Sequence, residues 1–359
     1  MRILLANSEM GFRGGEFQTL ALSRGLQRSG CEVMIAARAD SELARKASDA
    51  IPCMQFPFGP IPMATPLALA RLISRWQPDI LHAQTSLAHT HLWLARKILS
   101  GAAPLVVSRR VAFPIGRNPF SLLKYRTGVS HYVPISKAAA ASLISLGVDA
   151  SRITIIPSGV DVDAFGAAKG SLEVEQSWLI EKGSFIIGTV AAFEIEKGHR
   201  TLIRAAADIL RESPDARFIL IGEGRLEREI RGEIELLGIG RAVKCVHPGP
   251  PLEEVLPLFS VFVLPSIQEG LSTALIAAMA AGIPVVATMT GGIPDVVSEG
   301  SGLLVPPGDS SALARAVVSL VNDEDLRKKM GEAGKKRSAD FDMSRTVERT
   351  LALYRRILQ

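Results

Sequence analysis

The chain alternates short apolar runs with segments of helical periodicity from its first residues onward. R-I-L-L-A-N at 2–7 and D-I-L-H-A at 79–83 are β-rich, and each precedes a stretch whose apolar residues recur every three to four positions. P-L-V-V-S at 104–108 and Y-V-P-I-S at 132–136 continue the pattern. Strands that alternate with helices are typical of βαβ units, and therefore of a parallel sheet.

The same alternation restarts in the second half of the chain. Its apolar runs are F-I-I-G-T-V at 185–190, R-F-I-L-I-G at 217–222, V-F-V-L-P at 261–265, P-V-V-A-T at 284–288 and G-L-L-V-P-P at 302–307. We therefore predict an α/β protein with two Rossmann-like, doubly wound parallel sheets. The polar, Gly-containing segment at about 164–182 is the linker candidate between them.

A chain of 359 residues is too long for one hydrophobic core. We expect an N-terminal domain at 1–165, a C-terminal domain at 166–340 and a C-terminal helix at 341–359. Leu351 and Tyr354 lie at helical spacing in this last segment, so the helix should pack on one or both domains. Ligands of such sheets bind beyond the carboxyl ends of the strands, and two facing sheets would form an interdomain cleft.

Composition is that of a globular protein, with 47% apolar and 21% charged residues. Gly and Pro interrupt the apolar runs well before the roughly 20 residues of a membrane span. The first residues lack the apolar core of a signal peptide, so we expect a cytoplasmic protein. The three cysteines, Cys31, Cys53 and Cys245, lie far apart without metal-ligand spacing, and buried reduced thiols are expected.

The net charge of +5 is unevenly distributed along the chain. Residues 80–148 contain no Asp or Glu, and their basic residues are Arg96, Lys97, Arg109, Arg110, Arg117, Lys124, Arg126 and Lys137. We expect a positive face on the N-terminal domain. Apolar side chains alternate with these cations, so contact with an anionic membrane or a lipid-linked acidic acceptor is one interpretation. A basic surface around an ordinary core is the other, and no RNA-binding motif accompanies the charge.

Two turns after predicted strands carry residues suited to ligand binding. Gly14 and Gly15 precede a helix and allow close approach of the backbone to a ligand, although the G-x-G-x-x-G fingerprint is absent. Lys197, in A-A-F-E-I-E-K-G-H, could neutralise a phosphate beside the N–H groups near Gly198. A tight turn without a ligand and a solvated lysine are the respective alternatives.

The third turn is E-G-L-S-T-A-L-I-A-A-M-A-A-G, which follows the run V-F-V-L-P. It contains Glu269, and Ser272 or Thr273 begins a helix that Gly282 ends. Glu269 could accept hydrogen bonds from sugar hydroxyls, or it could be an exposed charge at a helix N-terminus. The backbone N–H groups that could bind a diphosphate follow it, at Gly270, Leu271, Ser272 and Thr273.

Together these segments resemble glycosyltransferase family 4, over essentially the whole chain. The most specific block is L-P-S-I-Q-E-G-L-S-T-A-L-I-A-A-M-A-A-G-I-P-V-V-A-T-M-T-G-G-I-P-D-V-V. R-G-G-E-F-Q-T-L, D-I-L-H-A-Q, I-P-S-G-V-D, E-K-G-H, I-G-E-G-R-L and G-L-L-V-P-P-G-D support it in the family's order. The resemblance implies a GT-B fold and retaining transfer of a sugar from a UDP- or GDP-linked donor. The acceptor would be a glycan or lipid-linked molecule of envelope polysaccharide, lipopolysaccharide or glycolipid assembly, at the inner face of the membrane.

The resemblance also implies roles for individual residues, with Glu269 and Lys197 as the catalytic pair. Glu269 would hold the donor sugar and Lys197 the diphosphate, and neither a protein nucleophile nor a metal or other cofactor would be required. The acceptor side would comprise Gly14, Gly15, His82, Arg109 and Arg110. The nucleobase and ribose would lie near Val246, His247 and position 277.

Three positions depart from the family pattern. Ala277 stands where the family places a second acid that binds the ribose. Residues 191–195 lack the Arg often found before E-K-G, so phosphate binding would rest on Lys197, with help from Arg225 in the G-E-G-R turn. Gln84 replaces a second His. These changes leave open a catalytically impaired binding or partner subunit, whereas the motifs of nucleotide-sugar epimerases are not recognisable.

Overall fold

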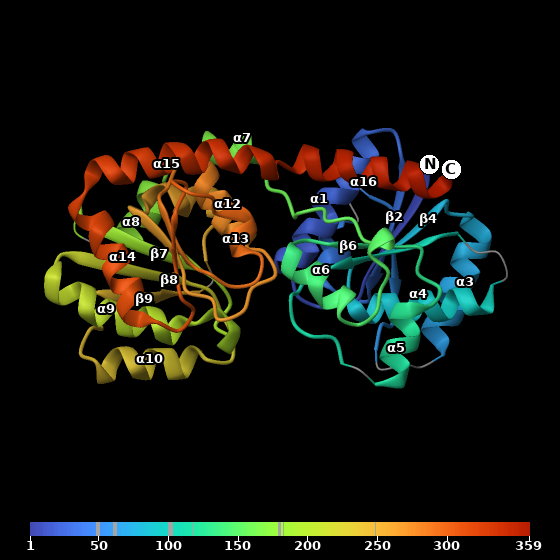
Figure 1. The fold of residues 1–359 in the computed structure, drawn as a ribbon, viewed down its shortest axis with the longest axis horizontal. Coiled ribbons are helices and arrows are strands. Elements are labelled where there is room, and N and C mark those ends of the chain that lie inside the picture. The colour runs from blue at the N-terminus through green and yellow to red at the C-terminus, as the bar shows by residue number, and fades with distance from the viewer. Residues whose placement is uncertain are drawn as a thin grey trace. The chain divides into compact units, whose positions relative to one another are not determined.

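The computed structural model describes residues 1–47, 51–59, 63–99, 103–116, 118–178, 181, 183–247 and 249–359. The chain forms two compact units. Unit 1 comprises Met1–Gly159 and Met343–Gln359, and unit 2 comprises Val160–Asp342. In each unit, helices flank a parallel sheet (Figure 1).

Unit 1 contains a six-stranded parallel sheet in the order β3-β2-β1-β4-β5-β6. Its strands are β1 (Arg2–Asn7), β2 (Glu32–Arg38), β3 (Cys53–Phe56), β4 (Ile80–Ala83), β5 (Leu105–Arg109) and β6 (His131–Pro134). After β3 the chain returns to the far side of β1 and adds β4 there. The order of the strands therefore reverses between β1 and β4, and the loops that follow these two strands diverge at their carboxyl ends.

Helices cover both faces of this sheet, because its central strand is apolar on both sides. Leu4 joins the cluster on one face, and Ile3 and Leu5 join the cluster on the other; all three are fully buried. The helices are α1 (Gly14–Arg28), α2 (Glu42–Ala47), α3 (Ala64–Trp76), α4 (Ser86–Ile98), α5 (Pro119–Arg126), α6 (Lys137–Ile144) and α16 (Met343–Leu358), with a 3₁₀ turn η1 (Ala150–Arg152).

The C-terminal helix α16 belongs to unit 1, although it is the last element of the chain. It packs beside α1 (Figure 1, red). Val347, Leu351 and Tyr354 are buried in the cluster that contains Ile3, whereas Leu358 is exposed. The amphipathic face of α16 therefore completes the core on one side of this sheet.

Unit 2 repeats the architecture, with the strand order β12-β11-β10-β7-β8-β9. The strands are β7 (Phe185–Val190), β8 (Ala216–Ile221), β9 (Val243–Val246), β10 (Val261–Leu264), β11 (Val285–Thr288) and β12 (Leu303–Val305), all parallel. Here the order reverses between β7 and β10. The turns after β7 and β10 therefore occupy the position at which such sheets bind ligands.

The helices of unit 2 surround this sheet, and Ile187, Val263 and Val286 of the central strands are fully buried beneath them. The helices are α7 (Val162–Gly166), α8 (Leu172–Ser177), α9 (His199–Glu212), α10 (Glu227–Leu236), α11 (Leu252–Val255), α12 (Thr273–Ala280), α13 (Ile293–Val296), α14 (Ser310–Asn322) and α15 (Glu324–Ser338). Three 3₁₀ turns accompany them, η2 (Ile195–Lys197), η3 (Leu256–Leu258) and η4 (Ala339–Phe341).

The prediction of two doubly wound parallel sheets is confirmed. Three strands that the sequence pattern did not single out, β2, β3 and β9, complete the sheets. Within the part of the chain that the structure describes, no helix has both the length and the apolar composition needed to cross a membrane. Arg117, in the basic span, and Pro248, in the turn after β9, lie outside the described residues.

Candidate functional site

In unit 2, the turns after β7 and β10 are hydrogen-bonded to each other at the point where the strand order reverses. The backbone N–H groups of Ile267 and Gln268 donate to the carbonyl oxygen of Glu196, over 2.8 and 3.1 Å. Gly198 has φ +67°, and a Cβ atom there would lie 2.0 Å from the carbonyl oxygen of Pro265. Only glycine permits both this backbone conformation and this approach of the two turns.

The two predicted catalytic residues meet here. Nζ of Lys197 lies 2.6 Å from Oε2 of Glu269, and their side chains are 27% and 8% exposed. The Glu269 carboxylate also accepts hydrogen bonds from Oγ of Ser266 (3.3 Å) and from the N–H of Gly270 (3.1 Å). Three donors therefore hold one largely buried carboxylate in place, and the hydrogen bond from Lys197 is charge-assisted.

The loop after β11 holds the backbone of Glu269 from the other side. Gly291 has φ +55°, and a Cβ atom there would lie 1.6 Å from the carbonyl oxygen of Glu269. The N–H of Gly292 donates to the same oxygen over 3.2 Å. The position of the carboxylate is thus set by loops from three adjacent strands, β7, β10 and β11.

The N-terminus of α12 follows this carboxylate directly. Ser272 is the N-cap, and its hydroxyl accepts a hydrogen bond from the N–H of Leu275 (3.2 Å). Other N–H groups of a first turn have no partner within their helix and favour anions. Leu271 is buried and Thr273 is partly buried, whereas Ala277 is 1% exposed within the packed part of the helix. Gly282, with φ +77°, follows the helix, as predicted.

Other predicted site residues of unit 2 lie apart from this ion pair. Nε of Arg225, in the turn after β8, lies 2.8 Å from Oε2 of Glu194, and its side chain is 77% exposed. Val246 ends β9, and the exposed His247 beyond it pairs with Glu223, with 3.1 Å between Nε2 and Oε2. The structure therefore joins Lys197 to Glu269 and gives Arg225 a different partner.

His199 is a residue of this region to which the sequence analysis assigned no role. It is the first residue of α9 and is 2% exposed, with its ring edge-on to Phe193 at 4.8 Å between centroids. Neither ring nitrogen has a hydrogen-bond partner among the described residues. Burial, followed by the charge of Lys197, lowers the pKa of His199 to about 4, so the imidazole is neutral at pH 7. The signal in the sequence was its position directly after E-K-G, at a helix start.

In unit 1, the loops after β1 and β4 are also joined where the strand order reverses. Oγ of Ser8 lies 2.6 Å from Oγ1 of Thr85, the N-cap of α4. The N–H of Gln84 donates to the carbonyl oxygen of Ala6 over 2.8 Å, and Gln84 itself is 2% exposed. The two predicted glycines, Gly14 and Gly15, form the first residues of α1 beyond the loop that follows β1.

The two consecutive arginines at the end of β5 contact different parts of unit 1. Arg109 donates from Nη2 to the carbonyl oxygen of Phe113. Arg110 donates from Nη2 to Oε1 of Gln84 (2.6 Å) and from Nη1 to Oγ of Ser158 (3.2 Å). Burial lowers the pKa of Arg110 to about 10, against the opposing effect of the Glu16 charge. Only Arg110 therefore lies in the region where the strand order reverses.

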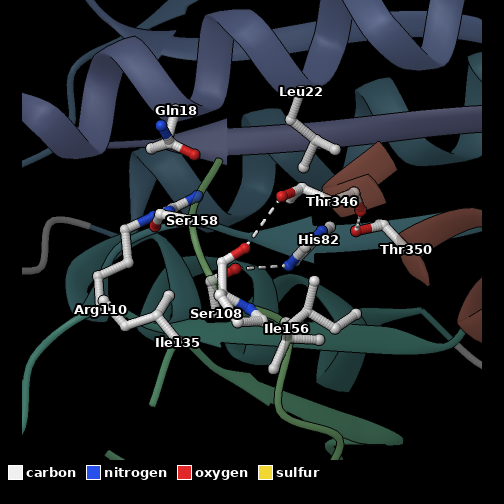
Figure 2. A pocket seen from close by; sticks show the side chains of 12 residues that line it. Gln18, Leu22, His82, Ser108, Arg110, Ile135, Ile156, Ser158, Thr346 and Thr350 are labelled. Carbon is white, nitrogen blue, oxygen red and sulfur yellow. Dashed lines mark hydrogen bonds between the residues drawn. The ribbon is translucent and has the colours of Figure 1, made fainter. Parts of the chain in front are cut away.

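His82 and Arg110 both line a small cavity of unit 1 (Figure 2). Its Nδ1 lies 2.5 Å from Oη of Tyr354, and its Nε2 lies 2.9 Å from Oγ of Ser108. Burial, and then the charge of Arg110, lower the pKa of His82 to about 3. Both ring nitrogens are thus occupied by protein groups, and His82 connects β4 with β5 and α16.

The basic span is only partly a surface feature. Lys124 is 5% exposed and donates to the carbonyl oxygen of Ser86 (3.2 Å) and to Oγ1 of Thr90 (3.0 Å). Burial, followed by the charge of Arg109, lowers its pKa to about 8. Two neighbours of Lys124 on α5 are large exposed apolar side chains, Phe120 at 42% and Leu123 at 51%.

Comparisons with known proteins cover both units. Residues 12–164 match the family described as Glycosyltransferase Family 4, and residues 171–337 match Glycosyl transferases group 1. The putative glycosyltransferase EpsD of Bacillus subtilis (strain 168) is 28% identical over 345 residues, which cover 91% of this chain and 90% of EpsD. The D-inositol 3-phosphate glycosyltransferase of Corynebacterium urealyticum is 33% identical over 218 residues, 57% of this chain and 51% of that protein.

Solved structures show the same fold. A glycosyltransferase from Rickettsia africae ESF-5 superimposes with a TM-score of 0.87 at 19% identity, over 100% of this chain and 98% of that one. Anabaena Alr3699/HepE in complex with UDP and glucose gives a TM-score of 0.85 at 20% identity, over 98% of both chains. The protein therefore belongs to glycosyltransferase family 4 and is a nucleotide-sugar glycosyltransferase with the GT-B fold.

Proposed function

We propose that the protein is a retaining hexosyltransferase that moves a sugar from a UDP-linked donor to a glycan or lipid-linked acceptor of envelope polysaccharide, lipopolysaccharide or glycolipid assembly. The observation that carries the proposal is the ion pair of Lys197 and Glu269, at the reversal of strand order in unit 2 and beside the N-terminus of α12. Cation, carboxylate and helix terminus together match the parts of a nucleotide sugar, because its diphosphate is anionic and its sugar carries hydroxyl donors.

Each part of this arrangement has a role in the transfer. Lys197 and the first turn of α12 stabilise the charge that develops on the departing diphosphate. Glu269 accepts hydrogen bonds from the sugar and fixes the anomeric carbon in position. The bond from that carbon to the phosphate oxygen breaks, the acceptor oxygen bonds to the carbon on the same face, and the donor phosphate takes the acceptor's proton. Lys197 and the helix terminus supply the positive charge that a metal ion supplies in other transferases.

The choice of UDP is supported by the structural relatives. Alr3699/HepE has been solved in complex with UDP and glucose and in complex with UDP-glucose, with a TM-score of 0.85 in both cases. A GDP-linked donor is the alternative.

The class of acceptor is supported by unit 1. Phe120 and Leu123 are exposed on α5 within a span of the sequence that lacks acidic residues. Apolar side chains among cations suit a peripheral contact with an anionic membrane, where lipid-linked acceptors reside.

Ligand-induced stabilisation of the purified protein tests the donor site. We expect UDP and UDP-sugars to raise the melting temperature, because a ligand at a hundred times its Kd adds about 2.7 kcal/mol of stability. GDP, ADP and CMP should have little effect. Glu269→Gln should abolish turnover, whereas the control Glu229→Gln, which alters an exposed ion pair with Arg200, should retain it. Full turnover by Glu269→Gln would contradict the proposal.

A catalytically impaired partner subunit is the second candidate, and Ala277 is the observation that favours it. This position carries a buried methyl group and so offers a nucleotide no carboxylate. Stabilisation by UDP without turnover of any UDP-sugar, in wild type and Glu269→Gln alike, would favour this candidate.

A further inference from the structure

Arg110 is a partly buried cation with a buried Nε atom. No carboxylate forms an ion pair with it in the part of the chain that the structure describes. Its guanidinium has five N–H donors, and the hydrogen bonds to Gln84 and Ser158 use two of them. Nε is buried and has no partner. Removing a charge from water without giving it a partner costs free energy, and perturbed charged groups are enriched at functional sites.

Gln84 adds a second buried donor at the same place. Its Oε1 accepts from Arg110, which leaves the Nε2 amide group with no partner, and the residue is 2% exposed. Buried polar groups without a hydrogen bond are rare in native structures. Arg110 and Gln84 are therefore adjacent, and each has an N–H donor without a hydrogen-bond acceptor. The acceptor oxygen of Gln84 is already bonded to Arg110.

Glu16 forms no ion pair with Arg110 in the described part of the chain, and its oxygens bond elsewhere. Arg110 is close enough to experience its charge, but the Glu16 oxygens accept from Nδ2 of Asn7 (3.3 Å) and from the N–H of Arg13 (3.0 Å). The start of α1, a helix of 15 residues, also lies against Arg110, because a Cβ atom on Gly15 would be 3.8 Å from its Cδ. The positive end of that helix favours an anion at the same point.

The cluster lies where the strand order reverses in unit 1, since Gln84 follows β4 and Arg110 follows β5. Figure 2 shows the Arg110 guanidinium beside Ser158 at the border of the small cavity. Open α/β sheets bind ligands at such a position. The preceding residue, Arg109, donates instead to the carbonyl oxygen of Phe113 and is not part of this cluster.

We infer that Arg110 and Gln84 bind an oxyanion, a phosphate or carboxylate, of the acceptor that receives the sugar. This inference rests on the proposed function and adds the chemical class of the acceptor. The donor's diphosphate is assigned to Lys197 and α12 in unit 2, so an oxyanion held in unit 1 belongs to the second substrate. The planar fork of Arg110 suits two oxygens at once, and the Gln84 amide supplies a further donor.

The test is the binding of small oxyanions to the full chain with the donor site already filled. Glycerol 1-phosphate and acetate are titrated in the presence of saturating UDP, and binding is followed by calorimetry and thermal shift. We expect at least one of the two to bind the wild-type protein. The one that binds more tightly shows whether the site prefers a phosphate or a carboxylate. Arg110→Met and Gln84→Met should each bind it at least tenfold more weakly, whereas Arg24→Met, which removes an exposed cation of α1, should bind it as wild type does.

Gln84→Glu sharpens the test because it places a carboxylate where an amide now contacts Arg110. It should raise the melting temperature and abolish oxyanion binding, since the cation would then have a permanent partner. A lowered melting temperature in Gln84→Glu, displacement of the oxyanion by UDP, or unchanged binding by Arg110→Met and Gln84→Met would each overturn the inference.

The same samples keep this inference separate from the proposed function. Stabilisation by UDP is measured in wild type and in every variant. If UDP binds throughout while no oxyanion does, the oxyanion site fails and the transferase assignment remains. If UDP does not bind at all, the proposed function itself has failed.

Discussion

The phenol of Tyr354 lies 2.5 Å from Nδ1 of His82, although 272 residues separate the two in sequence. Their rings meet edge-on at 5.8 Å between centroids, and both residues are buried. The other nitrogen of His82 contacts Ser108, so one neutral imidazole connects α16 with β4 and β5. The last helix of the chain is thus part of the core of unit 1.

Tyr354→Phe should lower the free energy of unfolding by about 1–3 kcal/mol, because it leaves a buried nitrogen of His82 without a partner. The ring itself is retained, so the loss isolates the hydrogen bond. Urea denaturation measures the effect. Leu358→Ala, on an exposed residue of the same helix, is the control and should change stability by less than about 0.5 kcal/mol. Equal effects of the two changes would contradict the assigned contact.

Gly25→Ala should destabilise the protein even though alanine favours helices. A Cβ atom on Gly25 would lie 2.3 Å from a methyl carbon of Val347, where α1 and α16 pack. Overpacking of this kind costs about 1–3 kcal/mol. Val347→Ala should recover much of the loss in the double variant. The matched control is Gly232→Ala in α10, which has no atom within 4 Å of its Cβ position and should stabilise by about 0.5–1 kcal/mol. Thermal unfolding distinguishes the two directions.

Lys197 and Glu269 should affect different parts of the donor. Lys197→Met removes the cation assigned to the diphosphate, so it should weaken both UDP and UDP-sugar, by roughly ten- to a hundredfold. Glu269→Gln should weaken the UDP-sugar and leave the affinity for UDP nearly unchanged. Calorimetric titration with both ligands checks the pattern. A loss of UDP affinity in Glu269→Gln as large as that in Lys197→Met would contradict the division of roles.

Stability should fall in weak acid because of His199. Its pKa is about 4 in the folded protein and about 6.5 when unfolded, so between these values only the unfolded chain binds the proton. The free energy of unfolding then decreases as pH falls from 6.5 to 4, by on the order of 3 kcal/mol for this group. His199→Phe should remove about one proton from the pH dependence measured by urea denaturation. Thr201→Val, a buried change in the same turn, should not.

Much of the site follows from local sequence. The sequence pattern placed four residues in turns that follow a strand and precede a helix: Lys197, Glu269, Gly14 and Gly15. This was possible because apolar runs and helix-start signals can be recognised within a few residues. The start of α12 at Thr273 after the Ser272 cap, and Gly282 after its end, agree with that reading. The family resemblance gave Arg109 and Arg110 one role, since adjacent residues at a strand end cannot be told apart without their surroundings.

The sequence by itself determined most of the strands and helices and which turns carry charge, because periodicity, caps and glycines act locally. Tertiary structure alone decided which turns meet. Lys197 reaches Glu269 because β7 pairs with β10. In this pairing Ile187 and Gly188 lie opposite Val261 and Phe262, which are 74 residues further along the chain. Arg110 reaches Gln84 because β5 pairs with β4, and α16 joins unit 1 through Tyr354. Strand order and helix docking depend on burial summed over distant segments, which no local pattern encodes.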